Sequence, residues 1–188
     1  MSTLTVDRRN SLWEVTSRTI VYAAIGAALY GILLVAQVPI PGSTVSVRPA
    51  FAIVPFFGYA FGPIVGFFTG LVGNMILDQL TGYGAFTAWN WSIANGPAGL
   101  VAGLLAASMS DRLRSSSGRI IGAAIIAAAA TLIGFLFVFT DIWVFGNSFE
   151  AALTGSYGFV IVPNLIASVI LTPVLVAAWE PLKDAIGR

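Results

Sequence analysis

The chain has 188 residues, of which 57% are hydrophobic and only 9% are charged, so it is far more apolar than an ordinary soluble domain. Cysteine and histidine are both absent. Their absence excludes disulfides, cysteine nucleophiles, histidine bases and metal sites built from thiol or imidazole ligands. We therefore expect an integral membrane protein that forms a single transmembrane domain over residues 1–188.

Six apolar segments follow one another along the chain. A helix needs about 20 apolar residues to cross a bilayer, and the predicted spans cover residues 19–38, 47–60, 62–77, 87–109, 119–140 and 158–179. The second and third spans are short and meet at Pro63, which suits the first turn of a new helix. One broken helix with a re-entrant piece is the alternative. The predicted fold is an all-α bundle of six transmembrane helices.

The distribution of charge predicts the orientation of this bundle. With six spans and a cytoplasmic N-terminus, all but one of the basic residues fall on the cytoplasmic side, as the positive-inside rule requires: Arg8, Arg9, Arg18, Arg112, Arg114, Arg119, Lys183 and Arg188. The exception is Arg48, and the outer connections otherwise carry Asp78, Asp141 and Glu150. We therefore expect both termini in the cytoplasm and recognition on the outer side, where the connections are chemically richer.

The first predicted helix carries two pairs of alanines one turn apart, Ala23 with Ala27 and Ala24 with Ala28. Small residues at this spacing let a second membrane helix approach closely. This face packs either against the protein's own helices or against a separate membrane subunit, and both interpretations stay open.

Glycine recurs every four residues through the second and third spans, at Gly58, Gly62, Gly66 and Gly70. Neighbouring members of this series share a helix face, which predicts close helix packing. The series continues into Asn74 and Asp78. A buried amide at membrane depth needs hydrogen-bond partners, so we expect Asn74 to face Asp78.

Arg48 and Asp78 stand at the outer ends of the second and third spans. An ionisable residue within a membrane or at its edge is a functional-site hypothesis by default. The two side chains either contact a polar ligand or have a structural role, as an ion pair or as two solvated charges.

Aromatic and amide side chains gather at the outer ends of the fourth and last spans. Trp89 and Trp91 open the fourth span, and Asn95 follows one turn after Trp91. Tryptophan at a membrane interface commonly anchors the helix. Tryptophan beside amides is also typical of a pocket wall on which a planar ligand stacks. Tyr157 and Asn164 are one heptad apart near the last span, so they share a stripe of that helix. We expect this stripe either to line the same pocket or to form hydrogen bonds between helices.

Motifs for catalysis are missing from the sequence. There is no G-x-x-x-x-G-K-[ST] phosphate-binding loop, and the one lysine is Lys183, so the chain cannot be its own P-loop ATPase. No spaced carboxylate cluster suits metal-assisted chemistry either. We expect a protein that is not an enzyme and that carries no cofactor.

The run VRPAFAIVPFFGYAFGPIVGFFTGLVGNMILDQLTGYGAFTAWNWSIANGPAGLVAGLL, together with the alanine pairs, resembles the substrate-binding S component of energy-coupling factor (ECF) vitamin transporters. The resemblance implies a protein of the prokaryotic plasma membrane that captures a vitamin or vitamin precursor under its outer loops. It also implies a transmembrane T component and ATPase subunits as partners, with the T-contacting motif at Ala23, Ala24, Ala27 and Ala28.

The predicted substrate-binding residues are Trp89, Trp91, Asn95 and Asp78, with Asn74, Arg48, Tyr157 and Asn164 as further contributors. Aromatic rings, amides and one outer carboxylate suit a planar heterocycle that is neutral or cationic. Thiamine or its hydroxymethylpyrimidine precursor is the first hypothesis. Riboflavin and a queuosine-type precursor are alternatives, since an arginine also suits an anionic ligand. A stand-alone channel or secondary carrier is the alternative class of protein.

Overall fold

The computed structural model describes residues 12–39 and 46–185, which are mostly helical. The elements, in chain order, are α2 (Ser17–Leu33), β1 (Val38–Pro39), β2 (Ser46–Val47), η1 (Pro49–Ala52), α3 (Ile53–Phe61), α4 (Pro63–Leu80), α5 (Trp89–Ser108), α6 (Ser116–Gly134), η2 (Phe135–Thr140), α7 (Asp141–Val144), α8 (Phe149–Ala151), η3 (Ala152–Gly158) and α9 (Phe159–Ala185). Arg8, Arg9 and Arg188 lie outside the described residues.

Each predicted span coincides with a helical segment, although the ends differ. The first helix ends at Leu33, and Val38–Pro39 instead pairs in an antiparallel register with Ser46–Val47. This small hairpin was not expected, and it places Arg48 directly after a strand. The last helix continues to Ala185, beyond the predicted end at residue 179.

Three helical segments in the described part of the chain are long and apolar enough to cross a membrane: Pro63–Leu80, Ser116–Val144 and Phe149–Lys183. Ser17–Leu33 and Pro49–Phe61 are apolar but shorter. Helix α5 has 20 residues, and its polar side chains Asn90, Ser92 and Asn95 are buried within the bundle. These polar side chains therefore lie in the interior of the bundle and not toward solvent.

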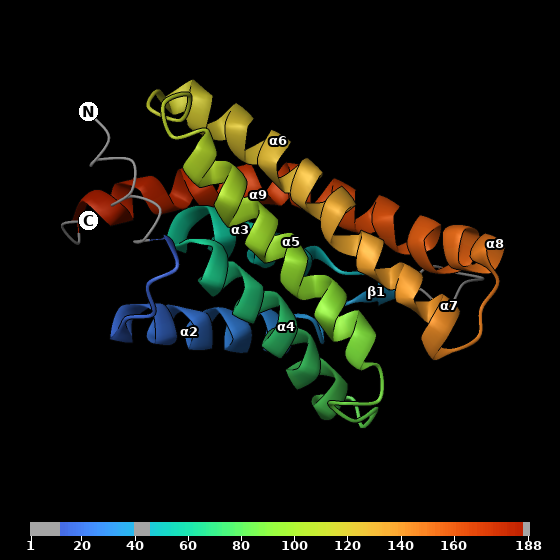
Figure 1. Ribbon diagram of the computed structural model, residues 1–188. Coiled ribbons are helices and arrows are strands. Elements are labelled where there is room, and N and C mark those ends of the chain that lie inside the picture. The colour runs from blue at the N-terminus through green and yellow to red at the C-terminus, as the bar shows by residue number, and fades with distance from the viewer. Residues whose placement is uncertain (1–11, 40–45, 186–188) are drawn as a thin grey trace.

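The helices pack in the order α2, α4, α5, α6 and α9, and α3 contacts α4, α5 and α9 (Figure 1). The start of α2, the α3–α4 turn, the α5–α6 connection and the end of α9 lie at one end of the bundle, on the left in Figure 1. The β1 strand, the α4–α5 connection, α7 and α8 lie toward the opposite end. The long helices α4, α5, α6 and α9 therefore alternate in direction, whereas α2 and α4 run the same way because the short α3 runs back between them.

A glycine followed by a proline separates α3 from α4. Gly62 has a φ of 104°, a left-handed conformation that suits glycine after the end of a helix. Pro63 then occupies the first turn of α4, as the sequence predicted. The two short apolar segments are thus separate helices joined by a tight turn.

Glycines let α3, α4 and α5 pack with their backbones in contact. A Cβ atom at Gly99 would collide with the carbonyl oxygen of Gly66, and one at Gly70 would collide with the carbonyl oxygen of Asn95. A Cβ at Gly58 would likewise meet the carbonyl oxygen of Gly99. The predicted close packing is confirmed at Gly58, Gly66 and Gly70 but is wrong at Gly62, where a Cβ atom would meet open space. The contact at the other three glycines fixes the position of α5 relative to α4.

Candidate ligand-binding site

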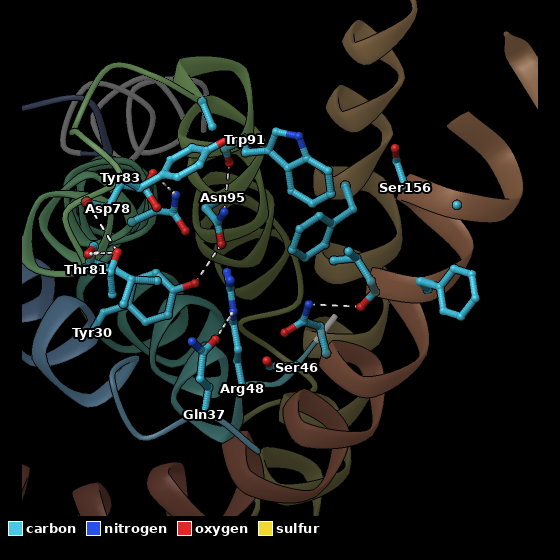
Figure 2. A pocket seen from close by; sticks show the side chains of 18 of the residues that line it. Tyr30, Gln37, Ser46, Arg48, Asp78, Thr81, Tyr83, Trp91, Asn95 and Ser156 are labelled. Carbon is cyan, nitrogen blue, oxygen red and sulfur yellow. Dashed lines mark hydrogen bonds between the residues drawn. The ribbon is translucent and has the colours of Figure 1, made fainter. Parts of the chain in front are cut away.

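A cavity of about 720 Å³ opens among the described residues at the end of the bundle that carries β1 and the α4–α5 connection. Its volume falls within the range of about 300–1,000 Å³ that is typical of small-molecule sites. The wall is built from segments far apart in the sequence and includes Tyr30 of α2, Arg48, Asp78 of α4, Trp91 and Asn95 of α5, Ser156 of η3 and Asn164 of α9 (Figure 2).

One side of the cavity is held by a buried chain of hydrogen bonds from α2 to α5. The Tyr30 hydroxyl donates to Asn95 Oδ1 at 2.7 Å, and Asn95 Nδ2 donates to the Trp91 carbonyl oxygen at 2.8 Å (Figure 2). Tyr30 is only 1% exposed. Asn95 was predicted to line the site, but its partner Tyr30 was missed because a single tyrosine in an apolar helix carries no distinguishing pattern.

Asn74 and Asp78 form a second polar group, one helical turn apart on α4. Asn74 Nδ2 donates to Asp78 Oδ2 and to Ser92 Oγ, both at 3.1 Å, so the predicted contact between Asn74 and Asp78 is confirmed. Because a carboxylate only accepts hydrogen bonds, the orientation of the amide is fixed. The Asn74 Oδ1 atom consequently has no hydrogen-bond partner among the described residues.

Arg48 faces the cavity without a carboxylate partner. Its Nε donates to Gln37 Oε1 at 3.3 Å, and it forms no ion pair with any residue that the structure describes. The Arg48–Asp78 ion pair considered as a structural alternative is therefore not formed. The guanidinium and the carboxylate instead line the same cavity without contacting each other as an ion pair.

Trp91 lines the cavity, whereas Trp89 does not. Residues two apart on an α-helix are rotated by about 200°, so only one of the pair can face inward. Trp89 is 47% exposed. The Trp91 indole Nε1 donates to Asp141 Oδ1 at 3.0 Å, a contact that the sequence did not predict because Asp141 was placed in an outer connection.

Tyr157 also lies outside the cavity, although its neighbour Ser156 and the predicted Asn164 line it. The Tyr157 hydroxyl donates to the Leu132 carbonyl oxygen at 3.1 Å, and its ring stacks on Phe139 with centroids 5.3 Å apart. The expected heptad stripe is broken here because η3 is a π-helix, whose wider turn shifts the register of side chains.

The sequence model of the family described as "ECF-type riboflavin transporter, S component" matches residues 14–180 of this chain. The chain belongs to this family. The resemblance read from the sequence is thereby confirmed, and the S component is a multi-pass protein of the cell membrane.

Relatives of this S component include the "UPF0397 protein" of Streptococcus pneumoniae strain CGSP14 and "UPF0397 protein spr0429" of strain R6, each 39% identical over 89 residues. These alignments cover 47% of this chain and 48% of each relative, so the chain spans about half the length of the curated relatives it matches. A solved S component of a bacterial ECF transporter superposes with a TM-score of 0.60, covering 91% of this chain and 98% of that one at 19% identity. This likeness shows the shared fold.

The alanine face of the S component borders a separate apolar groove of about 290 Å³ between α2 and α4. Ala23, Ala24 and Ala27 line this groove with Ile64 and Phe68 of α4, among others, whereas Ala28 does not. Ala24 is exposed, and Ala27 is only 4% exposed. Ala27 therefore packs within the bundle, whereas Ala24 is exposed on its surface.

Proposed function

We propose that this S component captures a vitamin or vitamin precursor in the 720 Å³ cavity and delivers it to an ECF-type importer. The observation that carries this proposal is the cavity itself, which combines an aromatic wall with an arginine, a carboxylate and buried amides. A transmembrane T component and ATPase subunits supply the remaining functions, because the chain has no phosphate-binding loop of its own.

We further propose six membrane spans with both termini in the cytoplasm, in a single domain over residues 1–188. Arg18, Arg112, Arg119 and Lys183 belong to the end of the bundle on the left in Figure 1, where α2 starts, α5 and α6 connect, and α9 ends. The positive-inside rule assigns this end to the cytoplasm. The cavity, at the opposite end, then faces the outside, which is the side from which an importer receives its substrate.

The polarity of the cavity favours an uncharged heterocycle that carries both donor and acceptor groups. A cationic ligand would meet the Arg48 guanidinium, and an anionic ligand would meet the Asp78 carboxylate, because both line the cavity and form no ion pair with each other. Riboflavin is uncharged and is named in the description of the family, so it replaces thiamine as the first ligand to test. Thiamine, hydroxymethylpyrimidine and a queuosine-type precursor complete the panel.

Replacement of Trp91 by alanine is expected to weaken riboflavin binding about tenfold to a hundredfold, which corresponds to the loss of one stacking ring at about 1–3 kcal/mol. Trp89→Ala is the matched control, because the same side chain is removed from the same helix two residues away, outside the cavity. Calorimetric titration of both variants against riboflavin measures the difference.

Equal effects of the two tryptophan variants would contradict the proposed site. If none of the panel binds to the unaltered protein, mass spectrometry of small molecules retained through gentle purification identifies the ligand, and the two variants are then titrated with it. A stronger affinity for thiamine than for riboflavin would overturn the argument from Arg48, while leaving the position of the cavity intact.

A further inference from the structure

Asp141 is a buried carboxylate that accepts hydrogen bonds from three side chains. Asn90 Nδ2 donates to Oδ1 at 2.7 Å, Trp91 Nε1 donates to the same oxygen at 3.0 Å, and Ser156 Oγ donates to Oδ2 at 2.8 Å. Asp141 is 2% exposed, and within the described ranges it forms no ion pair. A buried carboxylate without a cation is costly unless its oxygens are hydrogen-bonded, so the three donors are what make this position possible.

Two of these three donors line the ligand cavity, whereas Asp141 itself does not. Trp91 belongs to α5 and Ser156 to η3, and Figure 2 shows their side chains on neighbouring parts of the cavity wall. Asp141, at the start of α7, therefore lies behind the cavity wall and is hydrogen-bonded to two residues of that wall, Trp91 and Ser156. An ionised carboxylate has only acceptor sites, so it can serve all three donors at once, which an amide or a hydroxyl cannot.

The η3 segment needs such an attachment. It is a π-helix of seven residues, Ala152–Gly158, and π-helical turns are uncommon and occur frequently at functional sites. Three side-chain hydrogen bonds join it to other described elements: Thr154 donates to the Glu150 carbonyl of α8, Ser156 donates to Asp141, and Tyr157 donates to the Leu132 carbonyl. Of the three donors, only Ser156 lines the cavity.

We propose that Asp141 is a positioning residue for ligand capture, which sets the orientation of the Trp91 indole and fixes η3 against α5. The inference rests on the proposed function, because it assumes that Trp91 stacks on a ligand. With its N–H bonded to Asp141, the indole presents a fixed face to the cavity, and the wall is organised before the ligand arrives. Organisation before binding raises affinity because less ordering remains to be done when the ligand enters.

Asp141→Asn tests this proposal, since the asparagine side chain offers one acceptor oxygen and directs an N–H₂ group at a donor. We expect the riboflavin dissociation constant to rise about tenfold, mainly through faster dissociation. Glu150→Gln is the control, because Glu150 is an exposed acidic residue on neighbouring α8. An equal loss of affinity in the two variants would overturn the proposal.

A double-mutant cycle separates positioning from general destabilisation. Trp91→Phe keeps an aromatic ring but removes the N–H, so Asp141→Asn should have a smaller effect on riboflavin affinity in that background. Additive effects would mean that Asp141 does not act through Trp91. If Asp141→Asn fails to fold, Ser156→Ala provides the test, because it removes only the bond between η3 and Asp141 and should speed riboflavin dissociation while leaving the Trp91 contact in place.

A measurement on the ligand-free protein keeps this proposal distinct from the proposed function. The indole N–H resonance of Trp91, assigned by its disappearance in Trp91→Phe, should move in Asp141→Asn and stay in place in Glu150→Gln. Amides of residues 152–158 should also exchange faster with solvent in Asp141→Asn. If neither the Trp91 resonance nor the exchange of these amides changes in Asp141→Asn, the proposed role of Asp141 is overturned. This outcome does not depend on whether riboflavin binds to the unaltered protein.

Discussion

Gly99→Leu is expected to prevent the accumulation of folded protein. Even the first carbon of a side chain at this position would collide with the carbonyl oxygen of Gly66, which is backbone and cannot move aside by rotating a side chain. Overpacking a protein interior typically costs about 1–3 kcal/mol, and more where the structure cannot yield. Here the two helices α4 and α5 would have to separate, and close backbone contact is a main source of helix association in membranes.

The measurement is the yield of monodisperse protein in mild detergent together with its midpoint of thermal unfolding. Gly99→Ala should lower that midpoint, and Gly99→Leu should lower the yield as well. Gly155→Ala is the matched control for stability, because a Cβ atom at Gly155 would meet open space. If the midpoint of thermal unfolding of Gly99→Leu equals that of the unaltered protein, α4 and α5 do not pack as described.

The helices and their packing could be predicted from the sequence because both depend on patterns within one segment. Apolar runs predicted where the helices lie, and the four-residue glycine series predicted where α4 is closely packed. The pairing of Asn74 with Asp78 was predicted for the same reason, since residues one turn apart on a helix are neighbours. The end of α2 at Leu33 was missed because the hairpin that follows it contains apolar Val38.

The cavity wall was predicted less completely because it depends on contacts between distant segments. Tyr30 meets Asn95, and Asp141 meets Trp91 and Ser156, across helices whose relative rotation the sequence does not reveal. Nothing in the sequence distinguished Trp91 from Trp89 as a cavity residue. In the structure, the rotation of α5 places Trp91 in the cavity wall and Trp89 outside it. Asp141 in the sequence looks like any acidic residue in a polar connection, and only its three donors distinguish it.

Ala24→Leu is expected to impair uptake while leaving ligand binding by the isolated S component nearly intact. The groove that Ala24 lines is apolar and lies between α2 and α4, and its small residues suit close approach by a helix of the T component. Ala24 is the best position for this test because it is exposed. Leucine at Ala27 would also disturb the interior, where Ala27 is 4% exposed.

Leucine in this groove should weaken assembly about tenfold to a hundredfold, if the clash costs about 1–3 kcal/mol as overpacking does elsewhere. Co-purification of the T component and the ATPases with tagged S component measures assembly, calorimetry with riboflavin measures binding, and uptake of labelled riboflavin by cells measures the combined outcome. Ala177→Leu is the matched control, since it makes the same substitution at an exposed alanine of α9. Should Ala24→Leu abolish riboflavin binding while the complex still forms, the alanine face would serve internal packing alone, and the T component would have to bind elsewhere.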